Sequence, residues 1–451
     1  MVDLSHGHAE PLSVGKKIRL LRRHARLPIE EFAEIIAIRK DTVSKIENDN
    51  GEYTAKHMEA IRKYFDIAGM PLTEYECMVN KESHYRWLAL IKAGKMDEAK
   101  AVCKDLANIV NLEPCDPDAV MRYRMLEAQM FIADKQYIAA EEKLNLPQDV
   151  IDRMSNENLY HYYFNKGYLH TSNERYADGI GFLEKAWKLV IEYENLLPEE
   201  DELLYFYMGL CYSYIEMPFR AIYFLNKCRD KFFESIIWNF KLGKNCALAL
   251  NYAKLNQFDE AGKLLDTCLI IAKSMRQGYC VGSVMFIYGY MHTMAENWTT
   301  AIEYFDTAIE ILYKGLDHYY ASYFHKIICI TKTRAFSKAR TELEKVEAIC
   351  GTDEVWSIYF KSLWQYIAVS SRMSRQNHIE IYNIQNVFIP YFIKHHDYYI
   401  AIEYYKLLRQ HFKRCRSAEN AYQMAEKILE LYERCLISHV SYMPDRHMNY
   451  I

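Results

Sequence analysis

A small residue recurs about every forty positions through most of this chain, and this repeat constrains the fold more than any other feature. Its members are Ala99, Ala140, Gly179, Ala221, Ala261, Ala301 and Ala339, and Ala421 stands close to two further intervals on. Twelve residues earlier the chain often has another small residue, as at Ala128, Gly167, Gly209, Ala249 and Gly289. Two antiparallel helices approach closely where each has a small residue at the crossing point. The repeat therefore predicts an α-solenoid of helix pairs.

Large apolar residues follow the repeated small residue at helical spacing. Gly289, Ala301, Phe305 and Ala308 resemble the small and aromatic positions of the tetratricopeptide signature. The resemblance implies a right-handed solenoid, with helices longer than those of the standard unit of ~34 residues. We predict roughly nine such pairs over residues 83–437, with the eighth, after Gly351, lacking the pair of small residues.

Residues 13–68 have a different pattern, and we call them the headpiece. Their apolar residues recur at three and four positions in four short stretches, which contain Val14, Ile18 and Leu21, then Phe32 and Ile35, then Ile38, Val43 and Ile46, then Met58, Ile61 and Phe65. Breaks fall at Arg26-Leu27-Pro28, at Ala37 and at Asp49-Asn50-Gly51. The pattern predicts four short amphipathic helices that close a small core.

The third stretch of the headpiece has an outer face suited to DNA. With Val43 and Ile46 pointing inward, polar side chains are left on or near the outer side of a helix, and a helix fits the major groove. A run of cations in the first stretch suits phosphate contacts. The residues that we predict to bind DNA are Arg39, Lys40, Asp41, Thr42, Ser44 and Lys45, together with Lys16 and Lys17. A bundle used only for docking or dimerisation is the alternative, because acids nearly balance these cations.

The headpiece resembles a known DNA-binding motif. The pattern Phe32-Ala33, Ile38, Thr42-Val43-Ser44 and Ile46-Glu47-Asn48 is similar to the helix-turn-helix of the lambdoid-repressor, or XRE, family. The resemblance implies that Arg39 to Lys45 form the recognition helix, with Arg39, Lys40, Asp41 and Lys45 reading bases and Thr42 contacting a base or phosphate. It also implies that Glu47 is a buried structural acid. The family usually has Gly in the turn, where this chain has Ala37.

A headpiece of this kind joined to an α-solenoid resembles the RRNPP family of cytoplasmic receptors for short secreted peptides. The resemblance implies a peptide held in the concave groove formed by the first helix of each pair, with Asn amides pairing with the peptide backbone. The residues that we predict to bind the peptide are Asn165, Tyr168, Tyr207, Asn245, Lys254, Tyr290 and Lys332. Lys254 and Lys332 occupy equivalent positions in two pairs and suit a carboxylate. For each residue, an ordinary packing or solvated role is an equally open interpretation.

The remaining features exclude several classes of protein. A net charge of −4 confines any DNA contact to a local surface, and 12 cysteines without a Cys-x-x-Cys pair predict reduced thiols and a cytoplasmic protein. We expect a flexible tail at residues 1–12, a connecting helix at 69–82 and a loose tail at 438–451. No signal peptide, membrane span, catalytic motif, metal site or cofactor site is expected.

The sequence thus predicts an all-α, peptide-responsive transcriptional regulator that binds an operator as a homodimer and is not an enzyme. One alternative is a peptide-controlled interaction module that docks and inhibits a signalling protein such as a response regulator. Another is a phage-type regulator with the same architecture.

Overall fold

The computed structural model describes residues 13–24, 27–51, 54–65, 84–91, 94–110, 117–193, 201–228, 238–351, 353–371 and 377–436. Every regular element in these ranges is helical, so the predicted all-α class is confirmed. The chain divides into two compact units, unit 1 (Met1–Leu204) and unit 2 (Tyr205–Ile451). The two predicted tails and the predicted connecting helix at 69–82 lie outside the described residues.

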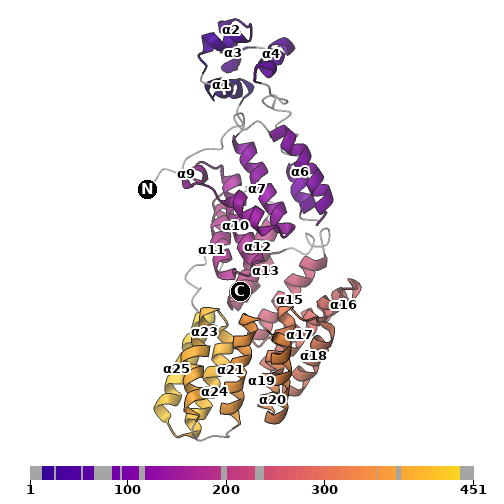
Figure 1. The fold of residues 1–451 in the computed structure, drawn as a ribbon, viewed down its shortest axis with the longest axis vertical. Coiled ribbons are helices and arrows are strands. Elements are labelled where there is room, and N and C mark those ends of the chain that lie inside the picture. Colours follow the sequence, from indigo (N-terminus) through magenta and orange to yellow (C-terminus); the bar gives the residue numbers. More distant parts are fainter. Residues whose placement is uncertain are drawn as a thin grey trace. The chain divides into compact units, whose positions relative to one another are not determined.

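The headpiece consists of four short helices that share one core (Figure 1). They are α1 (Val14–His24), α2 (Ile29–Ile35), α3 (Lys40–Glu47) and α4 (Ala55–Phe65). Ile18, Phe32, Val43, Ile46 and Ile61 fill the centre, and each is at most 1% exposed. The predicted inward positions of Val43 and Ile46 are therefore correct.

Two backbone positions fix how the helices of the headpiece meet. A Cβ atom on Gly15 would lie 1.9 Å from the carbonyl oxygen of Ile46, so only glycine allows α1 to approach the end of α3 this closely. In the α2–α3 turn, Ala37 has a φ of +56°. An L-residue with a side chain is strained in this left-handed region, where glycine is not.

Unit 1 continues with helix pairs. A helix at 84–91 packs with α6 (Met96–Val110), α7 (Pro117–Ala133) with α8 (Tyr137–Leu144), and α10 (Asn156–Ser172) with α11 (Tyr176–Glu192). The short helix α9 (Gln148–Ile151) lies between the last two pairs in the sequence.

Unit 2 contains the later pairs, the first of which begins with the last four residues of unit 1. They are α12 (Asp201–Tyr214) with α13 (Pro218–Lys227), α15 (Trp238–Lys254) with α16 (Phe258–Ser274), α17 (Gly278–Met294) with α18 (Trp298–Ile311), and α19 (Asp317–Lys332) with α20 (Phe336–Cys350). The next pair joins α21 (Glu354–Ser370) to α22 (His378–Asn383) and α23 (Ile389–Lys394), which a π-helical turn, η1 (Ile384–Phe388), connects. The last pair is α24 (Tyr398–Arg414) with α25 (Ala418–Leu436), beside α21 and α23 (Figure 1). The helix pair that was predicted to lack the two small residues, the one after Gly351, is thus the pair that contains the π-helical turn.

The predicted close crossing of helices is present within the pairs. A Cβ atom on Gly289 would lie 2.6 Å from the Phe305 ring, and one on Gly209 would lie 2.5 Å from Leu225. The first helix of a pair therefore has a glycine where the second helix inserts a large side chain. First helices also pack on one another, α15 on α17, α17 on α19 and α19 on α21, so they form a continuous layer in unit 2.

A repeated turn reverses the chain within most pairs. Three residues join the two helices, and the middle one has a φ between +59° and +65° at Lys135, Glu174, Glu216, Asn256, Glu296 and Arg334. The turn geometry is therefore the same whether the middle residue is charged or polar, and its side chain projects from a fixed backbone.

Candidate nucleic-acid and peptide interfaces

The DNA-binding candidates at α3 are all at least partly exposed. Arg39, Lys40, Asp41 and Lys45 are exposed, and Thr42 and Ser44 are half-buried. Arg39 precedes the helix at its N-cap and Lys45 lies in its last turn. Lys40 has an internal partner, because its ammonium group lies 2.6 Å from a carboxylate oxygen of Glu30 on α2. Lys16 and Lys17 lie on α1, but their side chains are outside the part of the chain that the structure describes.

A buried ion pair holds α3 against α1. The Arg22 guanidinium donates to both carboxylate oxygens of Glu47, at 2.7 and 2.9 Å, and to the Leu27 carbonyl oxygen at 2.7 Å. Hydrogen bonding to Glu47 raises the pKa of Arg22 above its ordinary value. Glu47 is only 2% exposed. The buried structural acid implied by the XRE resemblance is therefore present, and it orients the helix that carries the candidate readers.

Asn165, the leading peptide-binding candidate in unit 1, is fully buried. Its Nδ2 donates to the Met125 carbonyl oxygen of α7 at 2.7 Å, so the amide connects two first helices. Its Oδ1 has no hydrogen-bond partner among the described residues. Tyr168, three residues later, is half-buried and its ring lies 6.1 Å from that of Phe164.

Lys254, a candidate in unit 2, is held inside the protein. Its ammonium nitrogen lies 3.6 Å from a carboxylate oxygen of Glu216, and it donates to the Ser213 carbonyl oxygen at 3.3 Å. It also lies over the ring of Tyr399, 5.3 Å from the centroid. Burial raises the pKa of Glu216 to about 7, against the lowering effect of Lys254.

Lys332, at the equivalent position of another pair, also has an internal partner. Its ammonium group forms an ion pair with Glu403 of α24, and Tyr366 of α21 donates to the same carboxylate at 2.6 Å. Both lysines that suited a peptide carboxylate are therefore neutralised by carboxylates of this chain. Both also contact α24.

The three remaining candidates of unit 2 are buried. Tyr207, Asn245 and Tyr290 are 9%, 8% and 7% exposed. Burial raises the pKa of the Tyr290 hydroxyl, and the negative charges of Glu216 and Asp397 add to this rise.

Sequence reasoning missed the partners of these lysines. Glu216 and Asp397 lie in turns between helices, where no helical phase assigns a direction to the side chain. Asp397 ends the three-residue connection, His395-His396-Asp397, between α23 and α24. Glu403 could have been noticed in the sequence as an acid on the first helix of a pair. Nothing in the sequence connects it with Lys332, which lies on a distant helix.

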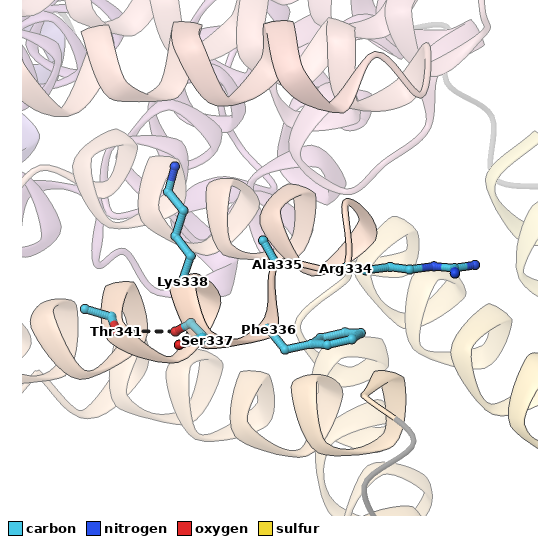
Figure 2. Close-up of a pocket in the computed structure, with 6 residues that line it drawn as sticks. All are labelled: Arg334, Ala335, Phe336, Ser337, Lys338 and Thr341. Carbon is cyan, nitrogen blue, oxygen red and sulfur yellow. Dashed lines mark hydrogen bonds between the residues drawn. The ribbon is translucent and has the colours of Figure 1, made fainter.

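A surface hollow at the α19–α20 turn does not coincide with the candidates. Arg334, Ala335, Phe336, Ser337, Lys338 and Thr341 line it, and Figure 2 shows Arg334 and Lys338 extending away from each other. The Thr341 hydroxyl donates to the Ser337 carbonyl oxygen at 3.3 Å (Figure 2). The lining contains no carboxylate, imidazole or thiol. Among the described residues, no cluster of three or more metal-ligating side chains occurs, and no helix is long and apolar enough to cross a membrane.

The geometry defines a tetratricopeptide-like α-solenoid that follows a small helical headpiece in the sequence, and solved structures match most of this chain. The NprR protein in complex with its cognate peptide NprX matches with a TM-score of 0.62 at 18% identity, over 78% of this chain and 99% of that one. A Rap protein complexed with Competence and Sporulation Factor matches with a TM-score of 0.62 at 14% identity, over 79% and 98%. The apo form of the quorum sensor NprR from B. thuringiensis has a TM-score of 0.60 at 17% identity, over 78% and 98%.

These matches confirm the tetratricopeptide-like α-solenoid fold that the sequence predicted. No protein-family model and no curated protein sequence matches this chain. The likeness is therefore one of architecture, carried by helix packing rather than by residue identity.

Proposed function

We propose that this protein is a peptide-responsive transcriptional regulator, which binds operator DNA through the headpiece and a short signalling peptide through the solenoid. The observation that carries the DNA half is the outer face of α3, where Arg39, Asp41 and Lys45 are exposed on a helix anchored by the Arg22–Glu47 pair. The peptide half is supported by the fold, because NprR has been solved with the peptide NprX and a Rap protein with Competence and Sporulation Factor. The free thiols of the described cysteines suit the cytoplasm, where the operator would lie.

In this proposal, two copies of the chain place two α3 helices in successive major grooves of a two-half-site operator. Arg39 and Lys45 reach base edges or phosphates from the two ends of the helix. The peptide binds one arrangement of the dimer better than another and shifts the population toward it.

Selection from genomic DNA tests the DNA half. Purified protein is incubated with fragmented genomic DNA at about 0.15 M salt, where binding through phosphates alone is weak, and the retained fragments are sequenced. We expect a two-half-site sequence that is lost in Arg39→Ala/Lys45→Ala. The matched control is Lys56→Ala/Lys63→Ala, which removes the same charge from exposed positions of α4 and should retain the sequence. Equal loss in both variants would show that only charge matters.

The second candidate function is a receptor that docks and inhibits a signalling protein such as a response regulator. One observation favours it: Lys40 pairs with Glu30, and the exposed face of α2 carries Glu30, Glu31 and Glu34, which repel phosphate. If no DNA is enriched even with culture-derived peptides present, and Arg39→Ala/Lys45→Ala leaves the cellular output intact, this second function replaces the first.

Asn165 tests the peptide half. Its Oδ1 is buried and has no hydrogen-bond partner among the described residues, so a peptide N–H that reaches it on binding would satisfy it, and Asn165→Ala should weaken binding of a culture-derived peptide by ~1 to 3 kcal/mol in calorimetry. Asn251→Ala is measured in parallel, because Asn251 is equally buried, donates to the Ser213 hydroxyl at 2.7 Å and also has an Oδ1 without a partner among the described residues, so a loss of affinity in only one variant assigns the peptide contact to that residue. Unchanged affinity in Asn165→Ala would remove this residue from the site.

A further inference from the structure

The first turn of α24 is capped from a distant part of the chain. The first N–H groups of a helix have no partner within the helix and need an acceptor. Asp397 stands at the N-cap, but its side chain makes no capping hydrogen bond and instead accepts from the Tyr359 hydroxyl of α21. The backbone N–H of Tyr399 donates to Glu216 at 2.7 Å, although Glu216 lies 183 residues earlier. Glu216 therefore caps the N-terminus of α24 in place of Asp397.

Lys254 completes this joint from a third helix. It pairs with Glu216 and lies over the Tyr399 ring, while the Tyr399 hydroxyl donates to the Lys254 carbonyl oxygen at 3.4 Å. The turn after α12, the end of α15 and the start of α24 thus meet at one point. Because these elements belong to the beginning and the end of unit 2, the joint closes the unit on itself.

The joint is polar and carries more acid than base. Burial raises the pKa of Glu216 to about 7 and that of Asp397 to about 6, while Lys254 opposes both shifts. The titratable groups that face Glu216 from the packed elements are Lys254, Asp397, Tyr290, Tyr359, Tyr398, Tyr399 and Cys435. A buried polar network is strong when all its members are paired and weak when one is lost.

We propose that Glu216 is a releasable clasp, which holds α24 against the ends of α12 and α15, and whose release opens unit 2 and frees the Lys254 ammonium group. The clasp needs neither DNA nor peptide, so it goes beyond the proposed function. The Lys332–Glu403 pair lies one helical turn further along α24 and would separate in the same movement. Any carboxylate that binds Lys254 must first displace Glu216.

Hydrogen exchange of α24 in the full-length protein tests the clasp. In Glu216→Ala, we expect the amides of the first turn of α24 to exchange about tenfold faster or more, because the acceptor of the Tyr399 N–H is lost. The matched control is Glu296→Ala, since Glu296 occupies the same turn position with the same φ of +59° but is exposed. Equal exchange in the two variants, with α17 protected in both, would overturn the proposal.

The pH dependence provides a second test that does not rely on Glu216→Ala folding. In the closed state Glu216 binds its proton up to a pKa of about 7, whereas a solvated Glu has an ordinary value of 4.5. The closed state therefore holds more protons between these values, so raising the pH through this window favours opening and acidification favours closure. Exchange of α24, corrected for its intrinsic rate, should rise with pH in the wild type and rise less in Glu216→Gln, which removes the contribution of Glu216 and retains those of Asp397 and of His395 and His396, whose pKa values burial lowers. The same rise in both proteins would show that Glu216 is not the clasp.

Discussion

The headpiece and the solenoid present their predicted functional residues in opposite ways. On α3 of the headpiece, four of the six candidates are exposed and the other two are half-buried. In the solenoid, Asn165, Tyr207, Asn245, Lys254 and Tyr290 are buried, and Lys254 and Lys332 are paired with carboxylates of the same chain. A ligand can reach α3 as it stands, whereas the lysines of unit 2 must first leave internal partners.

The number of neighbours explains this difference. A short helix at the surface of a small bundle has one apolar side and one solvated side, so its polar residues point outward. A first helix in unit 2 packs against its own partner and against the first helices before and after it. Little of its surface is left for solvent, and polar residues there are stabilised by one another.

Removing Arg22 should have the largest effect, and it tests whether the headpiece depends on the buried Arg22–Glu47 ion pair. Arg22→Ala leaves Glu47 buried without its guanidinium partner, so the headpiece should lose about 3 to 5 kcal/mol of unfolding free energy. Hydrogen exchange of α2 and α3 as a function of urea measures this loss. Lys40→Ala removes the exposed pair with Glu30 and should leave the same amides unchanged. Equal losses in both variants would contradict the contrast between buried and exposed pairs.

A methyl group at a crossing point tests the solenoid in the same way. Gly289→Ala puts a Cβ atom 2.6 Å from the fully buried Phe305 ring, so unit 2 should lose about 1 to 3 kcal/mol in urea unfolding. Gly262 lies in α16 with nothing within 4 Å of an added Cβ, and Gly262→Ala should stabilise its helix by up to about 1 kcal/mol. If both substitutions changed the free energy of unfolding in the same direction, packing against Phe305 would not determine the effect at Gly289.

The sequence predicted those features that depend on neighbours in the chain. The spacing of Gly289 and Phe305 identified a helix crossing, and the phase of Val43 and Ile46 identified the core side of α3. The contact of Glu216 with Tyr399 was beyond such reasoning. It depends on the rotation that each helix pair adds to the solenoid, and these small rotations accumulate over 183 residues. No local pattern encodes that sum, so the partners of Lys254 and Lys332 became evident only in three dimensions.

The smallest predicted effect compares the turn of the headpiece with the turns of the solenoid. Ala37 has a φ of +56° and Asn256 one of +60°, so both have left-handed backbone. Alanine has no polar side chain that could form a local hydrogen bond to offset the cost of the left-handed conformation, whereas Asn has one. Ala37→Gly should therefore raise the stability of the headpiece by up to about 1 kcal/mol, after the greater freedom of glycine in the unfolded chain is counted. Asn256→Gly should give no gain in unit 2, and a gain of the same size there would mean that turn strain is common to both regions rather than a property of Ala37.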